Sequence, residues 1–124
     1  MARAMVVDDS RAVRMLITRA LRGFGFEVME AANGRDALEA LDAAEAPMEL
    51  ILTDWNMPEM NGLELVKEIR TRTRFAATPV IMVSTETERD QMVVALAAGA
   101  TEYVMKPFTS ESLAGKLRMV GLPV

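Results

Sequence analysis

The chain has 124 residues, with 14 basic and 18 acidic side chains and a net charge of -4, a length that suits one domain. It contains neither cysteine nor histidine, which excludes disulfides, thiol catalysis, histidine metal ligands and a phosphohistidine within the chain. The acidic balance argues against a generic nucleic-acid-binding surface. No apolar stretch approaches the roughly 18 residues that a membrane span needs. We therefore expect a single domain over residues 1–124, monomeric and cytoplasmic, without membrane insertion.

Five short apolar runs predict five strands. Residues 4–7, 50–53, 80–83 and 103–105 are nearly unbroken in apolar character, which is typical of parallel strands covered on both faces. The run 26–31 includes Glu27 and Glu30, so we place this strand at an edge of the sheet.

Helical periodicity fills the segments between these runs. Apolar residues recur at i, i+3, i+4 and i+7, which predicts helices around residues 13–24, 37–41, 63–69, 92–98 and 113–120. Asn33 is an expected N-cap, and Gly99 is expected to end the fourth helix as a left-handed cap. That fourth helix is apolar nearly all round, which favours partial exposure. Repeated strand–helix units indicate an α/β fold with a parallel sheet and right-handed crossovers.

Two features of the helices stand apart from this pattern. Arg11, Arg14, Arg19 and Arg22 recur on the first predicted helix, and we interpret them as a solvated helix face. Gly115 lies inside the last predicted helix, where it costs about 1 kcal/mol relative to alanine.

Polar side chains follow four of the five predicted strands. In an open parallel sheet, ligands bind beyond the carboxyl ends of the strands. The polar residues at this rim are Asp8 and Asp9, Asp54, Ser84 and Thr85, and Lys106. Three neighbouring carboxylates raise one another's pKa, and a cation among them relieves the repulsion. An all-oxygen set with few ligands suits Mg²⁺.

This set of groups fits a transferred phosphoryl group. One carboxylate can act as the nucleophile, while Mg²⁺, an ammonium and a hydroxyl neutralise the phosphoryl oxygens. Each residue alone also has an ordinary interpretation: Asp9 or Ser10 as a helix cap, Asp54 as a turn residue, Lys106 as part of a surface loop. Their coincidence at one rim favours the phosphoryl site.

Four segments carry a resemblance to a known family. They are residues 6–10 (VVDDS), 53–62 (TDWNMPEMNG), 79–84 (PVIMVS) and 99–108 (GATEYVMKPF). In this order they resemble the response-regulator receiver domain of two-component systems, and the resemblance covers the whole chain. It implies a doubly wound, flavodoxin-like (βα)5 fold with five parallel strands in the order 2-1-3-4-5.

The resemblance also implies roles at the rim. Asp54 is the implied phosphoacceptor. Asp9 and Asp54 would bind Mg²⁺ by their carboxylates and Asn56 by its backbone carbonyl, with Asp8 acting mainly through a bound water. Lys106 would pair with the phosphoryl oxygens, and the bond from Lys106 to Pro107 is expected to be cis.

A switch and a partner are implied in the same way. Ser84 would move inward to hydrogen-bond the phosphoryl group, and Tyr103 would change from exposed to buried in step. Residues 54–58 and the absence of an output domain look most like the single-domain chemotaxis regulators (CheY-like). The implied phosphodonor is a histidine kinase, and the downstream target is a protein, with the flagellar motor switch as one candidate. The implied partner face comprises Met92, Tyr103, Met105, Phe108 and Lys116.

Departures and alternatives remain open at this point. Ser84 stands where threonine is more frequent in that subgroup, and Thr85 stands where a small residue is typical, which would narrow access to the phosphoryl group. A relay receiver or kinase regulator not acting on the motor is an alternative within the class, as is a scaffold that is never phosphorylated.

Other classes fit less well. A HAD-like phosphatase would need a general acid at Asn56, and a mononucleotide-binding electron carrier would be repelled by Asp8 and Asp9. We expect no enzyme activity beyond the domain's part in its own phosphorylation and dephosphorylation.

Overall fold

A five-stranded parallel sheet forms the centre of the molecule. The computed structural model describes residues 2–85 and 89–124. In chain order the elements are β1 (Arg3–Val7), α1 (Arg11–Gly23), β2 (Glu27–Ala31), α2 (Gly34–Ala43), β3 (Leu50–Thr53), α3 (Gly62–Arg70), the 3-10 turn η1 (Thr73–Phe75), β4 (Val80–Ser84), α4 (Arg89–Ala98), β5 (Glu102–Met105) and α5 (Ser110–Met119). The strand order is β2-β1-β3-β4-β5, with every neighbouring pair parallel. The predicted fold class and strand order are confirmed.

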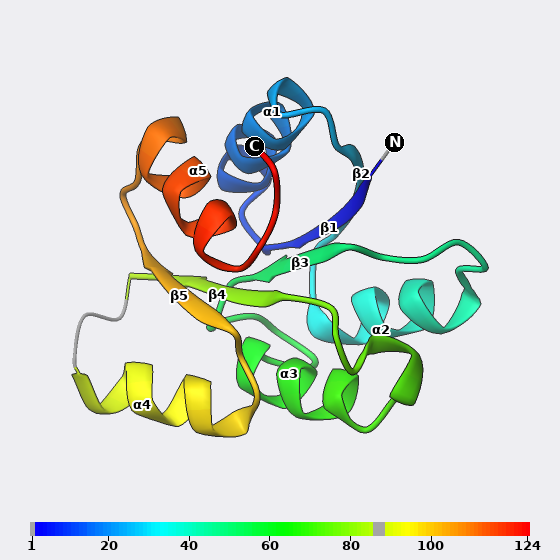
Figure 1. Cartoon of the computed structure of the whole chain (residues 1–124). Coiled ribbons are helices and arrows are strands. Elements are labelled where there is room, and N and C mark those ends of the chain that lie inside the picture. Colours follow the sequence, from blue (N-terminus) through cyan, green and yellow to red (C-terminus); the bar gives the residue numbers. More distant parts are fainter. Residues whose placement is uncertain (1, 86–88) are drawn as a thin grey trace.

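Helices cover both faces of the sheet, so the domain has two cores. Figure 1 shows α1 and α5 on one face and α2, α3 and α4 on the other. Side chains alternate between faces along a strand, and β1 illustrates this. Met5 and Val7 belong to the core under α2, α3 and α4, whereas Ala4 and Val6 belong to the core under α1 and α5. Burial on both sides explains why the strand segments are almost continuously apolar.

The second strand lies at an edge, as predicted. β2 pairs only with β1 in the sheet order, and its side chains Glu27 and Glu30 are exposed. The strand begins at Glu27, one residue later than expected. Phe26 is instead buried beside Leu21, and its N–H donates to the carbonyl of Leu21 at 3.0 Å. This contact closes the end of α1.

The predicted helix ends are present. The side chain of Asn33 accepts from the N–H of Asp36 at 2.8 Å and caps α2. Gly99 follows α4 with φ 120°, a value that favours glycine. Ser10 caps α1, accepting from the N–H of Val13 at 3.3 Å. α4 leaves several apolar side chains exposed, which confirms the expectation of partial exposure: Val93, Val94 and Leu96. Among residues 2–85 and 89–124, no helix is long and apolar enough to cross a membrane.

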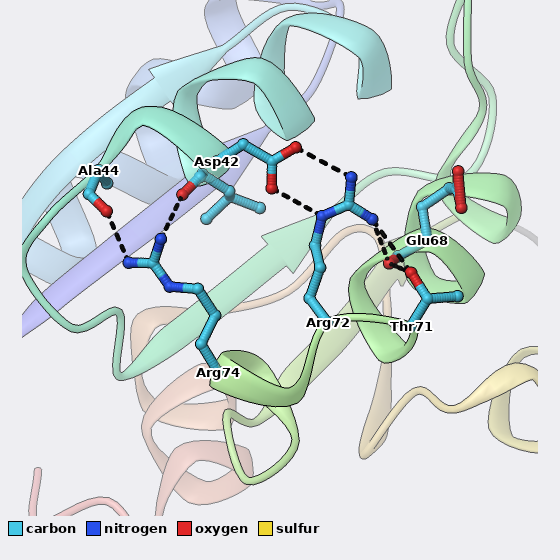
Figure 2. A network of polar contacts seen from close by, with 7 residues as sticks. Asp42, Ala44, Glu68, Thr71, Arg72 and Arg74 are labelled. Atoms are coloured by element: carbon cyan, nitrogen blue, oxygen red, sulfur yellow. Dashed lines mark hydrogen bonds and ion pairs between the residues drawn. The ribbon is translucent and has the colours of Figure 1, made fainter.

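Arginines fix the turn η1 against the end of α2 (Figure 2). The guanidinium of Arg72 donates to both carboxylate oxygens of Asp42, at 2.7 and 2.9 Å. Arg74 donates to the carbonyls of Ala44 at 2.6 Å and Leu41 at 3.4 Å. The hydrogen bond from Arg72 holds the pKa of Asp42 below its usual value. Both side chains are partly exposed, so the pair contributes at most about 1 kcal/mol.

Arg70 ties three elements together at the end of the sheet opposite the polar rim. Its Nε donates to the carbonyl of Gly99 at 2.9 Å, and its Nη1 donates to the carbonyls of Phe75 and Thr78, each at 2.9 Å. Its Nη2 donates to Oγ1 of Thr101 at 3.1 Å. One side chain therefore satisfies backbone acceptors after α3, after α4 and before β4.

We expect Arg70→Ala to lower the free energy of unfolding by about 2–3 kcal/mol, because partly buried carbonyls lose a charged donor. Urea unfolding followed by circular dichroism measures the change. Arg35→Ala is the matched control, since among the described residues Arg35 forms only an exposed pair with Glu59 at 3.8 Å. Its free energy of unfolding should stay within about 0.5 kcal/mol of the wild type. Equal midpoints for the two variants would contradict the role of Arg70.

Candidate functional site

Three carboxylates meet at the carboxyl ends of β1 and β3. Val7 and Thr53 lie opposite each other in the parallel ladder, so the next residues, Asp8 and Asp54, are neighbours. The N–H of Asp54 also donates to the carbonyl of Val7 at 2.8 Å. Carboxylate oxygens of Asp8, Asp9 and Asp54 lie within 4.8 Å of one another. The structure thus brings together the acidic residues that the sequence placed at one rim.

The ammonium of Lys106 lies between two of these carboxylates. Its Nζ is 2.9 Å from Oδ2 of Asp8 and 3.3 Å from Oδ1 of Asp54. All three side chains are largely buried, and that of Asp8 is only 1% exposed. The N–H of Lys106 donates to the carbonyl of Ser84 at 2.9 Å, and the peptide bond to Pro107 is cis, as expected.

The site changes the pKa of both Asp54 and Lys106. Burial raises the pKa of Asp54, and the charge of Asp8 adds to this effect. Lys106 and the N–H of Trp55, which donates to Oδ1 of Asp54 at 2.8 Å, act in the opposite direction. For Lys106, burial lowers the pKa, but the hydrogen bond to Asp8 and the charge of Asp54 outweigh it, so the pKa is raised. At Asp54, burial raises the pKa more than the repulsion from Asp8 does.

Asp8 is fixed from several directions. Its Oδ1 accepts from the N–H of Ser10 at 2.8 Å, which leaves Oδ2 toward Lys106. Its N–H donates to the carbonyl of Ala31 at 3.1 Å, and its own carbonyl accepts from Nη1 of Arg14 at 2.7 Å. Asp8 is thus a preorganised carboxylate.

The donor set fits a hard divalent cation. Asp9 is exposed, whereas Asp8 and Asp54 are buried, so the cluster opens to solvent on the Asp9 side. Asn56 lies two residues after Asp54 in the loop between β3 and α3, and it is exposed. Carboxylate and carbonyl oxygens together with water are the ligands that Mg²⁺ prefers. Asp8, Asp9, Asp54 and the carbonyl of Asn56 are the groups that could hold it.

The residues predicted to form the switch lie at the ends of β4 and on β5. Ser84 is fully buried at the end of β4, where it is opposite Met105 of β5. Tyr103 is 2% exposed and lies opposite Met82. The structure therefore has Tyr103 in the buried position, and the predicted change from exposed to buried stays a prediction. Thr85 is exposed and lines a groove of 340 Å³ with Lys106.

All members of the predicted partner face line one hollow. This hollow has a volume of 260 Å³ and is formed by α4, β5, α5 and the segment after β5; its lining includes Met92, Tyr103, Met105, Phe108 and Lys116. Met105 is 46% exposed, whereas Tyr103 is buried. Lys116 lies 3.3 Å from Oε1 of Glu102. The surface is apolar with one paired cation at its edge.

The sequence analysis did not predict the close contact between Gly62 and the backbone of Asp54. A Cβ atom at Gly62 would collide with the carbonyl oxygen of Asp54. The N–H of Gly62 donates to the carbonyl of Trp55 at 2.8 Å, which closes the loop after β3. Asn61 caps α3 in a capping box with Glu64. The Asn-Gly pair before an apolar helix was the available signal for this turn.

Comparison with known proteins identifies the class. The chain matches the response regulator receiver domain over residues 4–118, and it belongs to this family.

Several of the similar proteins are named as chemotaxis proteins. The chain is 47% identical to chemotaxis protein CheY1 of Helicobacter pylori over 117 residues, which is 94% of each chain. It is 44% identical to the chemotaxis protein CheY homolog of Campylobacter jejuni, covering 94% of this chain and 89% of that one. Its fold is similar to the solved structure of CheY4 of Vibrio cholerae, with a TM-score of 0.89, 38% identity and coverage of 97% and 98%. The chain is thus the receiver domain of a CheY-like chemotaxis response regulator.

We expect Gly62→Ala to destabilise the fold by about 1–3 kcal/mol, because the new methyl group overlaps the backbone of Asp54. Gly115→Ala is the control in α5: apart from the neighbouring residues and backbone of its own helix, no described atom lies within 4 Å of its Cβ position. Alanine should therefore stabilise the helix by about 1 kcal/mol. Thermal unfolding of both variants gives the signs. A loss of stability in both would show that the contact with Asp54 is not the cause.

We expect Asp54→Asn to raise stability at pH 7 in EDTA, by on the order of 1 kcal/mol. The folded state raises the pKa of Asp54 above 3.8, so the ionised carboxylate is disfavoured there. The protonated carboxyl group of Asp54 contributes its full stabilisation below pH 3.8. This contribution is lost as the pH rises through the pKa of the folded state. The advantage of asparagine should therefore disappear as the pH falls toward 3.8.

Urea midpoints across this pH range measure the effect. Asp9→Asn is the control at an exposed position, and its urea midpoint should be equal to that of the wild type or slightly higher. A lower midpoint for Asp54→Asn at pH 7 would contradict the destabilising role of the buried carboxylate.

Proposed function

We propose that this domain accepts a phosphoryl group on Asp54 from the phosphohistidine of a partner histidine kinase. An oxygen of the Asp54 carboxylate attacks phosphorus, the phosphorus–nitrogen bond breaks, and the donor imidazole leaves. The product is an aspartyl phosphate. The observation that carries the proposal is the position of Lys106 Nζ, 2.9 Å from Asp8 and 3.3 Å from Asp54, beside an acidic cluster.

The residues around Asp54 support the nucleophile. The contacts from Lys106 and the N–H of Trp55 oppose the effect of burial on its pKa, and so favour the ionised form that attacks. Asp9, Asp54 and the Asn56 carbonyl are the proposed Mg²⁺ ligands, with Asp8 acting through a water. Bound Mg²⁺ would neutralise charge on the phosphoryl oxygens.

Lys106 is proposed to exchange partners during the reaction. Before transfer it pairs with Asp8 and Asp54. After transfer, its ammonium pairs with a phosphoryl oxygen, and the hydroxyl of Ser84 moves to donate to another. Ser84 is the last residue of β4 and Lys106 directly follows β5, and these two strands are adjacent. A change at the phosphoryl group therefore reaches β5 directly.

The proposed output is a shift in the population of two states of the face formed by α4, β5 and α5. The side chain of Tyr103 changes its position in step with Ser84. The target contacts Met92, Met105, Phe108 and Lys116. The similarity to proteins named for chemotaxis favours a flagellar motor switch as that target over a phosphorelay partner. We propose that the domain acts as a monomer.

Fluorescence of Trp55 tests this function, because Trp55 is the single tryptophan and its backbone N–H donates to the carboxylate of Asp54. We expect Mg²⁺ to change the emission of the wild type, and acetyl phosphate to cause a second, Mg²⁺-dependent change. Asp54→Asn should abolish the second change. Glu39→Gln, which removes an exposed carboxylate from α2, should leave both changes intact. A response to acetyl phosphate that survives Asp54→Asn would place the phosphoacceptor elsewhere.

A further inference from the structure

A charged groove lies along α1, on the side of that helix toward the end of β2. Its volume is 710 Å³, and its lining includes Arg11, Arg14, Arg19 and Arg22 together with Glu30 at the end of β2. The groove lies beside the β2 edge of the sheet, whereas the face formed by α4, β5 and α5 lies at the β5 edge (Figure 1). It is thus separate from the face assigned to the target above.

The arginines form a continuous stripe. Their spacing of 3, 5 and 3 residues keeps them on one side of a helix. At 1.5 Å per residue, the stripe extends about 16 Å from Arg11 to Arg22. α1 contains no acidic residue, so the helix itself does not balance this charge.

Within residues 2–85 and 89–124, only one of the four guanidiniums has a bonded partner. Arg14 contacts Glu30 at 3.0 Å and the carbonyl of Asp8 at 2.7 Å. Arg11, Arg19 and Arg22 are exposed, and none of them forms a hydrogen bond or ion pair with any residue in the ranges 2–85 and 89–124. Three unpaired cations therefore share one groove in a chain whose net charge is -4.

Stability of the helix accounts for only part of the stripe. Arg22 lies in the last turn, where a cation matches the helix dipole. A cation at Arg11, in the first turn, opposes the helix dipole. Arg11 and Arg14, and likewise Arg19 and Arg22, are like charges at i and i+3, which destabilise a helix. The groove is also lined by Thr18, which is 3% exposed and whose hydroxyl has no hydrogen-bond partner in the described part of the chain. The arrangement of the arginines therefore indicates ligand binding more than it indicates a role in stabilising α1.

We propose that this groove binds an acidic polypeptide segment of a partner protein, whose carboxylates pair with Arg11, Arg19 and Arg22. The length of the stripe suits an extended or helical segment with several carboxylates. Met15 lines the same groove and is 47% exposed, so it offers an apolar contact to a peptide side chain between the charges. Glu30 within the groove and the net negative charge of the chain disfavour a nucleic-acid backbone, which needs a broad basic surface.

Fluorescence anisotropy with a fluorescein-labelled deca-glutamate peptide tests the proposal. The measurement uses the whole chain at low salt without Mg²⁺ or phosphodonor, so its result does not depend on the proposed phosphorylation. We expect the wild type to bind, and binding to weaken as salt is added. The double variant R19Q/R22Q should bind roughly fivefold more weakly, the effect of losing two exposed ion pairs. A deca-glutamine peptide should not bind.

The control variant R35Q/K67Q removes the same number of charges from exposed positions on α2 and α3. It should bind within twofold of the wild type, and both double variants should keep the wild-type urea midpoint. An equal loss of peptide affinity in R35Q/K67Q would show that binding depends only on overall charge, and it would overturn the proposed site. Absence of wild-type binding overturns it as well, as does tighter, Arg19- and Arg22-dependent binding of duplex DNA or phosphatidylglycerol vesicles.

Discussion

The ammonium of Lys106, held between the carboxylates of Asp8 and Asp54, is the interaction on which the polar end of this domain depends. Two carboxylates at the end of an apolar sheet would repel each other and lose hydration. One ammonium between them offsets both costs, but only if the ends of β1, β3 and β5 are brought to the same place. The parallel order of the strands meets this condition. Removing Lys106 would leave two buried carboxylates without their cation.

The same arrangement supports the proposed role of Asp54 as the nucleophile. A carboxylate that was fully satisfied by hydrogen bonds and ion pairs would be a poor nucleophile, because its lone pairs would be occupied. Asp54 has one backbone donor and one shared ammonium, and burial still raises its pKa. Asp8, in contrast, is held by Ser10 and Lys106. The two carboxylates therefore differ in how tightly they are held.

The sheet, and the meeting of the polar rim residues at one end of it, could be predicted from the sequence because both follow from local patterns. Apolar runs define the strands, and Asp8, Asp54 and Lys106 each come directly after one. The interactions that were not predicted join distant residues. Arg70 reaches Gly99 and Arg72 reaches Asp42, and no periodicity in the sequence marks such pairs. The start of β2 was wrong by one residue because Phe26 packs against the end of α1 rather than joining the ladder.

The acidic residues of β2 have a consequence for the behaviour of the chain at high concentration. An edge strand has backbone groups on one side that no neighbouring strand satisfies, and it can recruit the same strand of another molecule. Glu27 and Glu30 are exposed at this edge. Glu30 pairs with Arg14 at 3.0 Å, so the repulsion between two identical edges brought together would come mainly from Glu27. The charges that interrupt an otherwise apolar strand thus protect the domain against self-templated growth of its sheet, the first step toward fibrils.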